Sequence, residues 1–104
     1  MRYSADWMVL ADDRILEFLY NNDSGTPTKM RDSGYVRFSD AYISQRCKKL
    51  VEEGFLQHLG NGVYTITERG EKYLRGEIHA ETLEEIDQDQ DGILPGQGEA
   101  EDGA

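Results

Sequence analysis

The 104-residue sequence contains one cysteine, two prolines and no long uninterrupted run of apolar residues. A single cysteine excludes an internal disulfide framework and is typical of proteins of a reducing compartment. No apolar stretch approaches the ~20 residues that a membrane-spanning helix requires, and no signal-peptide pattern opens the chain. We therefore expect one small cytoplasmic domain that has no membrane partner.

The sequence also lacks the patterns on which enzymes and metal proteins depend. It has no nucleophile–base pair and no phosphate-cradling glycine loop, and neither His58 nor His79 has a second metal-type ligand at a useful spacing. The string DQDQDG (87–92) matches the start of an EF-hand loop, but the twelfth position, which requires a bidentate Glu, is Gly98. We expect no catalytic activity, no cofactor and no metal.

Positive charge is scarce and unevenly placed. Acidic residues outnumber Lys and Arg by 21 to 11, and ten of the acids lie in residues 77–104, which contain no Lys or Arg. Residues 1–76 are therefore formally neutral, yet residues 26–50 carry six bases against two acids. Because an approaching polyanion responds to the local field, this basic segment is the candidate contact region for one.

Apolar spacing and capping residues predict three helices in the first half of the chain. The first spans 11–22, with acids in its first turn. Thr26-Pro27 starts a short second helix, which Ser33-Gly34 ends. Ser39 caps a longer third helix over 40–53, whose expected buried stripe is Ile43, Cys47, Leu50 and Val51. This position makes Cys47 a small core residue and not a metal ligand or redox sensor.

A hairpin and a fourth helix are expected next. The β-like runs 55–59 and 63–66 are joined by Gly60-Asn61-Gly62, and Asn-Gly is a strong hairpin signal. Thr67 opens the fourth helix, in which Tyr73 is expected to cover the core. Residues 77–86 could form a short amphipathic helix through Ile78, Leu83 and Ile86, and residues 87–104 are expected to be a disordered acidic tail.

The order helix, helix, helix, hairpin, helix predicts a mainly α fold with a small β-hairpin, the winged helix-turn-helix, over residues 1–76. In this fold the third helix enters the DNA major groove and the hairpin, or wing, follows the backbone. The face opposite the buried stripe carries polar and basic side chains, and Gln pairs with adenine while Arg or Lys pairs with guanine. The candidate DNA-binding residues are Lys29, Arg37, Tyr42, Ser44, Gln45, Arg46, Lys48, Lys49 and Asn61.

The strings ADDRILEFL (11–19), YISQRCKKLVEEGFL (42–56) and GNGVYTITERGEKYLRG (60–76) resemble the small winged-helix regulators of halophilic archaea, of the phage phi-H repressor type. The resemblance implies a DNA-binding transcriptional repressor in a salt-accumulating cytoplasm. It also implies that Tyr42 to Lys49 form the reading helix and Gly60 to Gly62 the wing tip. The sequence departs from the family pattern at 29–33 and in its longer acidic tail, whose role the resemblance does not imply.

Two questions stay open at the level of sequence. A winged helix can also serve as a protein-interaction module without DNA, because a fold alone does not determine function. Such a module would present a more apolar third helix. We also expect a homodimer, formed by the first helix, by the segment around Trp7, or by the Ile78, Leu83 and Ile86 stripe; Trp7 could equally be simple core cover.

Overall fold

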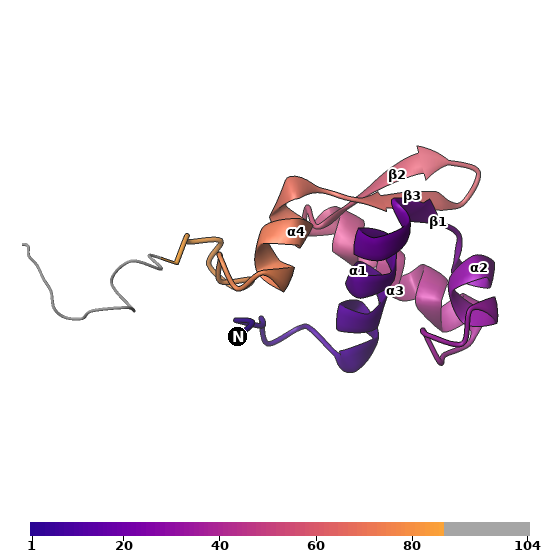
Figure 1. The fold of residues 1–104 in the computed structure, drawn as a ribbon, viewed down its shortest axis with the longest axis horizontal. Helices are drawn as coiled ribbons and strands as arrows, with labels where there is room; N and C mark the ends of the chain where they lie inside the picture. Colours follow the sequence, from indigo (N-terminus) through magenta and orange to yellow (C-terminus); the bar gives the residue numbers. More distant parts are fainter. Residues whose placement is uncertain (87–104) are drawn as a thin grey trace, which may run out of the picture.

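The computed structural model describes residues 1–86; the expected disordered tail (87–104) and the EF-hand-like string (87–92) lie outside the described residues. Within residues 1–86, the elements follow in the order α1, β1, α2, α3, β2, β3 and α4 (Figure 1). The chain therefore has the winged helix-turn-helix fold that the sequence predicted. The wing tip and α2 lie at one end of the molecule, and the N-terminus and residues 77–86 lie at the other.

Three of the helices begin at the capping hydroxyls identified in the sequence. Thr26, Ser39 and Thr67 each accept a hydrogen bond from the backbone amide three residues further on, at 3.1 to 3.2 Å. Each bond satisfies one of the amides that a helix start leaves without an intrahelical partner. The helices are α1 (Leu10–Asn22), α2 (Pro27–Asp32), α3 (Asp40–Glu52) and α4 (Glu68–Leu74).

The wing is an antiparallel hairpin of β2 (Leu56–Gly60) and β3 (Val63–Ile66), which confirms the predicted hairpin with β2 shifted by one residue. A third strand, β1 (Ser24–Gly25), pairs with the other edge of β3 and was not predicted. The two residues of β1 are too few to show the alternation of apolar and polar side chains that indicates a strand in a sequence. Gly25 lets β1 lie close against α1, because a Cβ there would lie 2.9 Å from the Phe18 ring.

The core lies between α1 and α3 and is closed by the first strand of the wing and by α4. Ile43, Cys47 and Leu50 are fully buried, as predicted, whereas Val51 is half-buried. Tyr73 is also fully buried and packs at 6.0 Å, between ring centroids, from Phe55. The other apolar side chains with no exposed surface are Ile15, Leu16, Leu19, Met30, Val36 and Phe55 itself.

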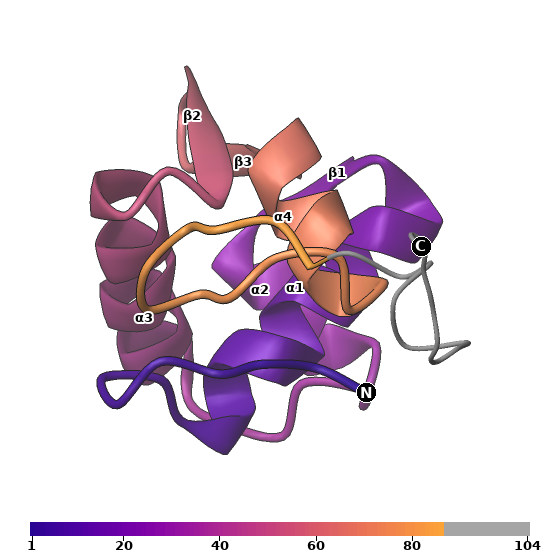
Figure 2. The same ribbon diagram turned by 90° about the vertical axis from the view of Figure 1, so that its left-hand side faces the viewer.

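The expectation of a helix within residues 77–86 is wrong. Ile78 pairs with Glu85 in an antiparallel bridge, and the backbone of Leu83 adopts a left-handed conformation at φ 64°. Ile78 and Ala80 are buried at alternate positions, which is the periodicity of an extended strand and not of a helix. The segment is held as a loop because Tyr3 pairs with it from the N-terminus, through the bond from Ala80 N to Tyr3 O at 2.8 Å (Figure 2).

Candidate nucleic-acid interface

A polar junction fixes α2 against the start of α3. Asp40, the first residue of α3, accepts a hydrogen bond from Thr28 Oγ1 at 2.9 Å and pairs with Arg31 Nη1 at 2.8 Å. Both partners come from α2, and Arg31 also bonds Asp32 at 2.9 Å. The two helices therefore form a single helix-turn-helix unit, in which the start of α3 is set by charge-assisted bonds.

The outer face of α3 is exposed over its whole length. Ala41, Gln45, Lys48 and Glu52 recur at helical spacing, and each of them is exposed. In Figure 2, α3 stands along one edge of the molecule and the hairpin rises beyond its end. This face carries a hydrogen-bonding amide (Gln45), a cation (Lys48) and a carboxylate (Glu52), and no large apolar side chain. It is therefore unlike a protein-docking surface and suited to polar readout.

Most cations in residues 1–86 are engaged by other groups of the chain, and three are not. Among these described residues, Lys29, Arg37 and Lys48 are exposed and have neither a side-chain hydrogen bond nor an ion pair. All three lie on α2, on the turn that follows it, or on α3. The remaining cations are bound by carboxylates or, for one of them, by a carbonyl oxygen: Arg2, Arg14, Arg31, Arg46, Lys49, Arg69, Lys72 and Arg75.

The structure turns two predicted contact residues away from this face. Arg46 pairs with the fully buried Asp12 through Nε at 2.9 Å and Nη2 at 2.8 Å, and this bonding raises the pKa of Arg46. Lys49 pairs with Glu53 at 3.1 Å and lies 5.3 Å from the centre of the Trp7 ring. Helical spacing could not reveal the partners of Arg46, because they lie more than thirty positions earlier in the chain.

Tyr42 and Ser44 flank the exposed stripe and are half-buried. The Tyr42 ring packs 5.3 Å, between centroids, from Phe38, so only part of this side chain remains available.

Trp7, for which core cover and a dimer contact were equally expected, packs 6.0 Å from the Phe55 ring and is half-buried. Its contacts with the body of the domain favour the first interpretation.

The wing is uncharged. The string LQHLGNGVYTI (56–66) contains no Lys, Arg, Asp or Glu. Asn61 and Gly62 at its tip both have positive φ angles, 54° and 73°, as a two-residue type I′ turn requires. An irregularity between His58 and Gly60 interrupts the ladder, and the intervening Leu59 is 54% exposed. The tip can thus offer an amide, backbone groups and an apolar side chain, but no ion pair.

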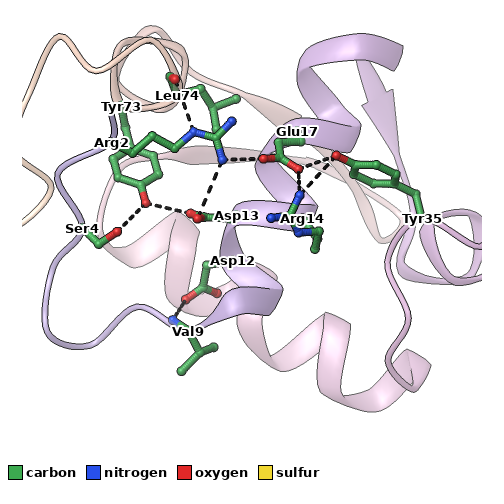
Figure 3. Close-up of polar contacts among 10 residues, drawn as sticks. All are labelled: Arg2, Ser4, Val9, Asp12, Asp13, Arg14, Glu17, Tyr35, Tyr73 and Leu74. Atoms are coloured by element: carbon green, nitrogen blue, oxygen red, sulfur yellow. Dashed lines mark hydrogen bonds and ion pairs between the residues drawn. The ribbon is translucent and has the colours of Figure 1, made fainter.

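A second polar network joins the N-terminal segment to α1 and α4 and, through Tyr35, reaches the segment between α2 and α3 (Figure 3). The Tyr73 hydroxyl bonds Asp13 at 2.7 Å and Ser4 at 2.8 Å, and burial raises the pKa of Tyr73 to about 12. Arg2 bonds Glu17 and the Leu74 carbonyl oxygen. Arg2 and Arg14 in this network each pair with a carboxylate, so the network ties the N-terminal segment to the body of the domain.

Three further properties of the described part of the chain bear on its function: whether it can bind a metal ion, cross a membrane or present a reactive thiol. Within residues 1–86, no group of three His, Cys, Asp or Glu side chains is placed to hold a metal ion. No helix in this range has the length and apolarity needed to cross a membrane. Cys47 is fully buried, and desolvation raises the pKa of its thiol to about 12.

Comparisons with known proteins agree with this geometry. A family model described as winged helix-turn-helix phage repressor matches residues 1–86. The repressor protein of Halobacterium phage phiH is 34% identical over 95 residues, which cover 81% of this chain and 98% of the relative. The crystal structure of the PhiH1 repressor-like protein from Haloarcula marismortui matches with a TM-score of 0.79 and 45% identity, over 83% of this chain and 98% of that one.

A more distant structure extends the likeness of fold. The reduced form of MarR from E. coli matches with a TM-score of 0.60 and 17% identity, over 83% of this chain and 60% of that one. At that identity the match shows a shared fold alone.

Proposed function

This chain belongs to the winged helix-turn-helix phage repressor family, and from that premise we propose that it reads specific sequences of double-stranded DNA through α3. The family is one of DNA-binding, repressor-type regulators and not of enzymes. In the proposed complex, the outer face of α3 enters the major groove, Gln45 contacts a base edge, and the wing approaches the backbone through Asn61.

One observation carries this proposal. In residues 1–86, the cations without any side-chain partner are Lys29, Arg37 and Lys48, and all of them lie in the helix-turn-helix unit. Elsewhere the protein neutralises its cations internally. Cations that are left free on a single structural unit of an acidic protein provide a local positive field, which is what attraction of a phosphate backbone requires.

A salt-dependent binding titration tests the proposal. A fluorescent random-sequence duplex serves as the probe, and Lys29, Arg37 and Lys48 are replaced together by Met. We expect the slope of log affinity against log salt to fall by about 3, because each neutralised phosphate contributes ~0.9. The matched control replaces Arg69, Lys72 and Arg75 of α4 and its end by Met, which changes the net charge equally. Equal slopes for the two variants would contradict a DNA face on the helix-turn-helix unit.

We further propose that the protein binds DNA as a homodimer, because a domain of this size contacts few base pairs and specificity requires two half-sites. Of the stripe expected from the sequence, Ile78 is buried within its own subunit, whereas Leu83 is 42% exposed. Leu10, 62% exposed at the start of α1, is the better candidate. Light scattering in molar KCl should give twice the chain mass of 11.8 kDa. Leu10→Ser should lower this mass, whereas Leu59→Ser on the wing should not.

A further inference from the structure

The side chain of Arg46 is held by three hydrogen bonds on the inner flank of α3. Its guanidinium donates to both carboxylate oxygens of Asp12, at 2.9 and 2.8 Å, and to the carbonyl oxygen of Trp7 at 3.1 Å. Asp12 belongs to α1 and Trp7 to the segment before it. A guanidinium that bonds both oxygens of a carboxylate has a defined orientation as well as a favourable energy.

Asp12 serves two elements at once. The side chain has no exposed surface, and its Oδ2 also accepts a hydrogen bond from the backbone amide of Val9, at 3.0 Å, where α1 begins. A buried carboxylate is stable only while its partners remain in place. The start of α1 and the middle of α3 therefore depend on one another through this group.

The position of Arg46 within α3 determines what the bond controls. Successive residues of an α-helix are separated by about 100° around its axis, so an inward Arg46 sets the direction of its neighbours. With Arg46 fixed toward Asp12, Gln45 and Lys48 are exposed. Lys49, one turn further along, reinforces this flank by lying over the Trp7 ring at 5.3 Å. Trp7 in the N-terminal segment thus contacts α3 at two successive turns, through Arg46 and through Lys49.

We propose that Asp12 and Arg46 are positioning residues for DNA recognition, which set the rotation of α3 about its own axis without touching DNA themselves. This inference rests on the proposed function and adds to it a source of specificity outside the interface. A rotation of α3 would displace the Gln45 amide from a base edge. Phosphate contacts would survive such a rotation better, because they depend less on direction.

The test compares a preferred duplex with a scrambled one. Wild-type protein first selects a preferred duplex from a random pool, and affinities are then measured in a KCl series for that duplex and for its scrambled counterpart. The main variant is Asp12→Asn/Arg46→Met, which removes both charges of the pair and keeps an acceptor for the Val9 amide. Arg46→Lys retains the charge but not the bidentate geometry. Lys48→Met is the control for a direct phosphate contact, and circular dichroism monitors folding.

We expect the double variant to be folded and to bind the scrambled duplex within about twofold of wild type, with an unchanged salt slope. Its preference for the selected duplex should fall roughly tenfold. The preference of Arg46→Lys for the selected duplex should lie between that of wild type and that of the double variant. Lys48→Met should weaken binding to both duplexes and lower the salt slope by about one.

The contrary outcomes are distinct. If the salt slope of the double variant falls by about one on the scrambled duplex, Arg46 contacts phosphate and the inference is overturned. If both affinities fall by the same factor, the pair acts on stability alone, which also overturns it. If wild-type protein neither selects a duplex nor binds in a salt-dependent way, the proposed function fails, and this inference fails with it.

Discussion

At the scale of single residues, the proposed complex uses the exposed stripe of α3 for two kinds of DNA contact. Lys48 can neutralise a phosphate at any sequence, whereas the amide of Gln45 has donor and acceptor groups in the arrangement that an adenine edge presents. Both side chains are exposed, and neither has a side-chain partner within residues 1–86. Their separate substitution should therefore affect affinity and specificity differently.

Gln45→Ala should relax sequence preference at one base pair, with a loss of ~1–3 kcal/mol on the preferred duplex and little change on a scrambled one. The substitution removes a directional pair of hydrogen bonds to one base, so the loss of binding free energy depends on the identity of that base. Competition binding against single-base-pair variants of the duplex measures it. Asn21→Ala on α1 removes an exposed amide elsewhere and should leave preference unchanged. Equal losses on preferred and scrambled DNA would show that Gln45 does not read a base.

Cys47 should behave as an inert core residue. Because burial raises its pKa from near 9 to about 12, almost no thiolate exists in the folded protein at pH 8. A disulfide reagent should therefore label Cys47 at least ~100-fold more slowly in native protein than in urea-unfolded protein. Rapid labelling of the native protein would contradict the assignment.

The raised pKa of the Cys47 thiol also predicts that the stability of the fold depends on pH. A raised folded-state pKa means that the contribution of Cys47 is fully present below about pH 9 and is lost as pH rises toward about 12. Tyr73, whose pKa is also raised to about 12, acts in the same direction from about pH 10. The free energy of unfolding should thus decline above pH 9. Cys47→Ala should flatten the first part of this decline, which urea titrations at several pH values can detect.

At the scale of elements, close approach of backbones decides how α4 closes the core. A Cβ on Gly70 would lie 2.6 Å from the Phe55 carbonyl oxygen and 2.6 Å from Ile66 Cγ1. The backbone oxygen cannot move aside as the end of a flexible side chain could. The small residue therefore lets α4 rest directly on the junction between α3 and the wing.

Gly70→Ala should destabilise the fold by ~1–3 kcal/mol, although alanine is the better helix former, because the added methyl group overfills a packed contact. Thermal or urea unfolding measures the change. Glu68→Ala, at an exposed position of the same helix, should stay within ~0.5 kcal/mol of wild type. A neutral or stabilising Gly70→Ala would show that α4 can shift away from the wing without loss.

At the scale of the whole molecule, the charge of the chain is divided between residues 1–76, which are formally neutral, and residues 77–104, which carry ten acids and no Lys or Arg. Residues 87–104 carry six acids and no bases, while residues 26–50 are net positive. Opposite charges tethered in one chain attract at low salt. The Debye length is ~10 Å at 0.1 M salt and ~3 Å at 1 M, so this attraction should fade as salt rises.

Deletion of residues 87–104 should therefore tighten DNA binding in dilute buffer and have little effect in molar salt. In dilute buffer, we expect the six acids to compete with phosphate for the free cations of the helix-turn-helix unit and to add self-repulsion. Titrations of full-length and truncated protein across a salt series provide the comparison. A variant with the six acids replaced by Asn and Gln keeps the length and should behave as the truncation does. Indistinguishable affinities at the lowest usable salt would rule out the competition.

The sequence by itself determined the features that depend on neighbours along the chain. Thr26, Ser39 and Thr67 cap helices because a hydroxyl reaches an amide only three residues away. Asn61-Gly62 forms the wing tip because these residues tolerate positive φ angles. The buried positions Ile43, Cys47 and Leu50 of α3 followed from apolar periodicity. The order of the four helices and the hairpin, without β1, also followed from the sequence, and with it came the fold class and the exposed positions Gln45 and Lys48.

Only the tertiary structure decided the features whose partners are distant in the chain. Arg46 was expected to face DNA, but it turns inward because Asp12, 34 residues earlier, supplies a buried carboxylate. Residues 77–86 form a bridged loop and not a helix because Tyr3, from the far end of the chain, pairs with them. Local propensity is worth a fraction of a kcal/mol per residue, so burial and long-range bonding overrule it wherever they disagree.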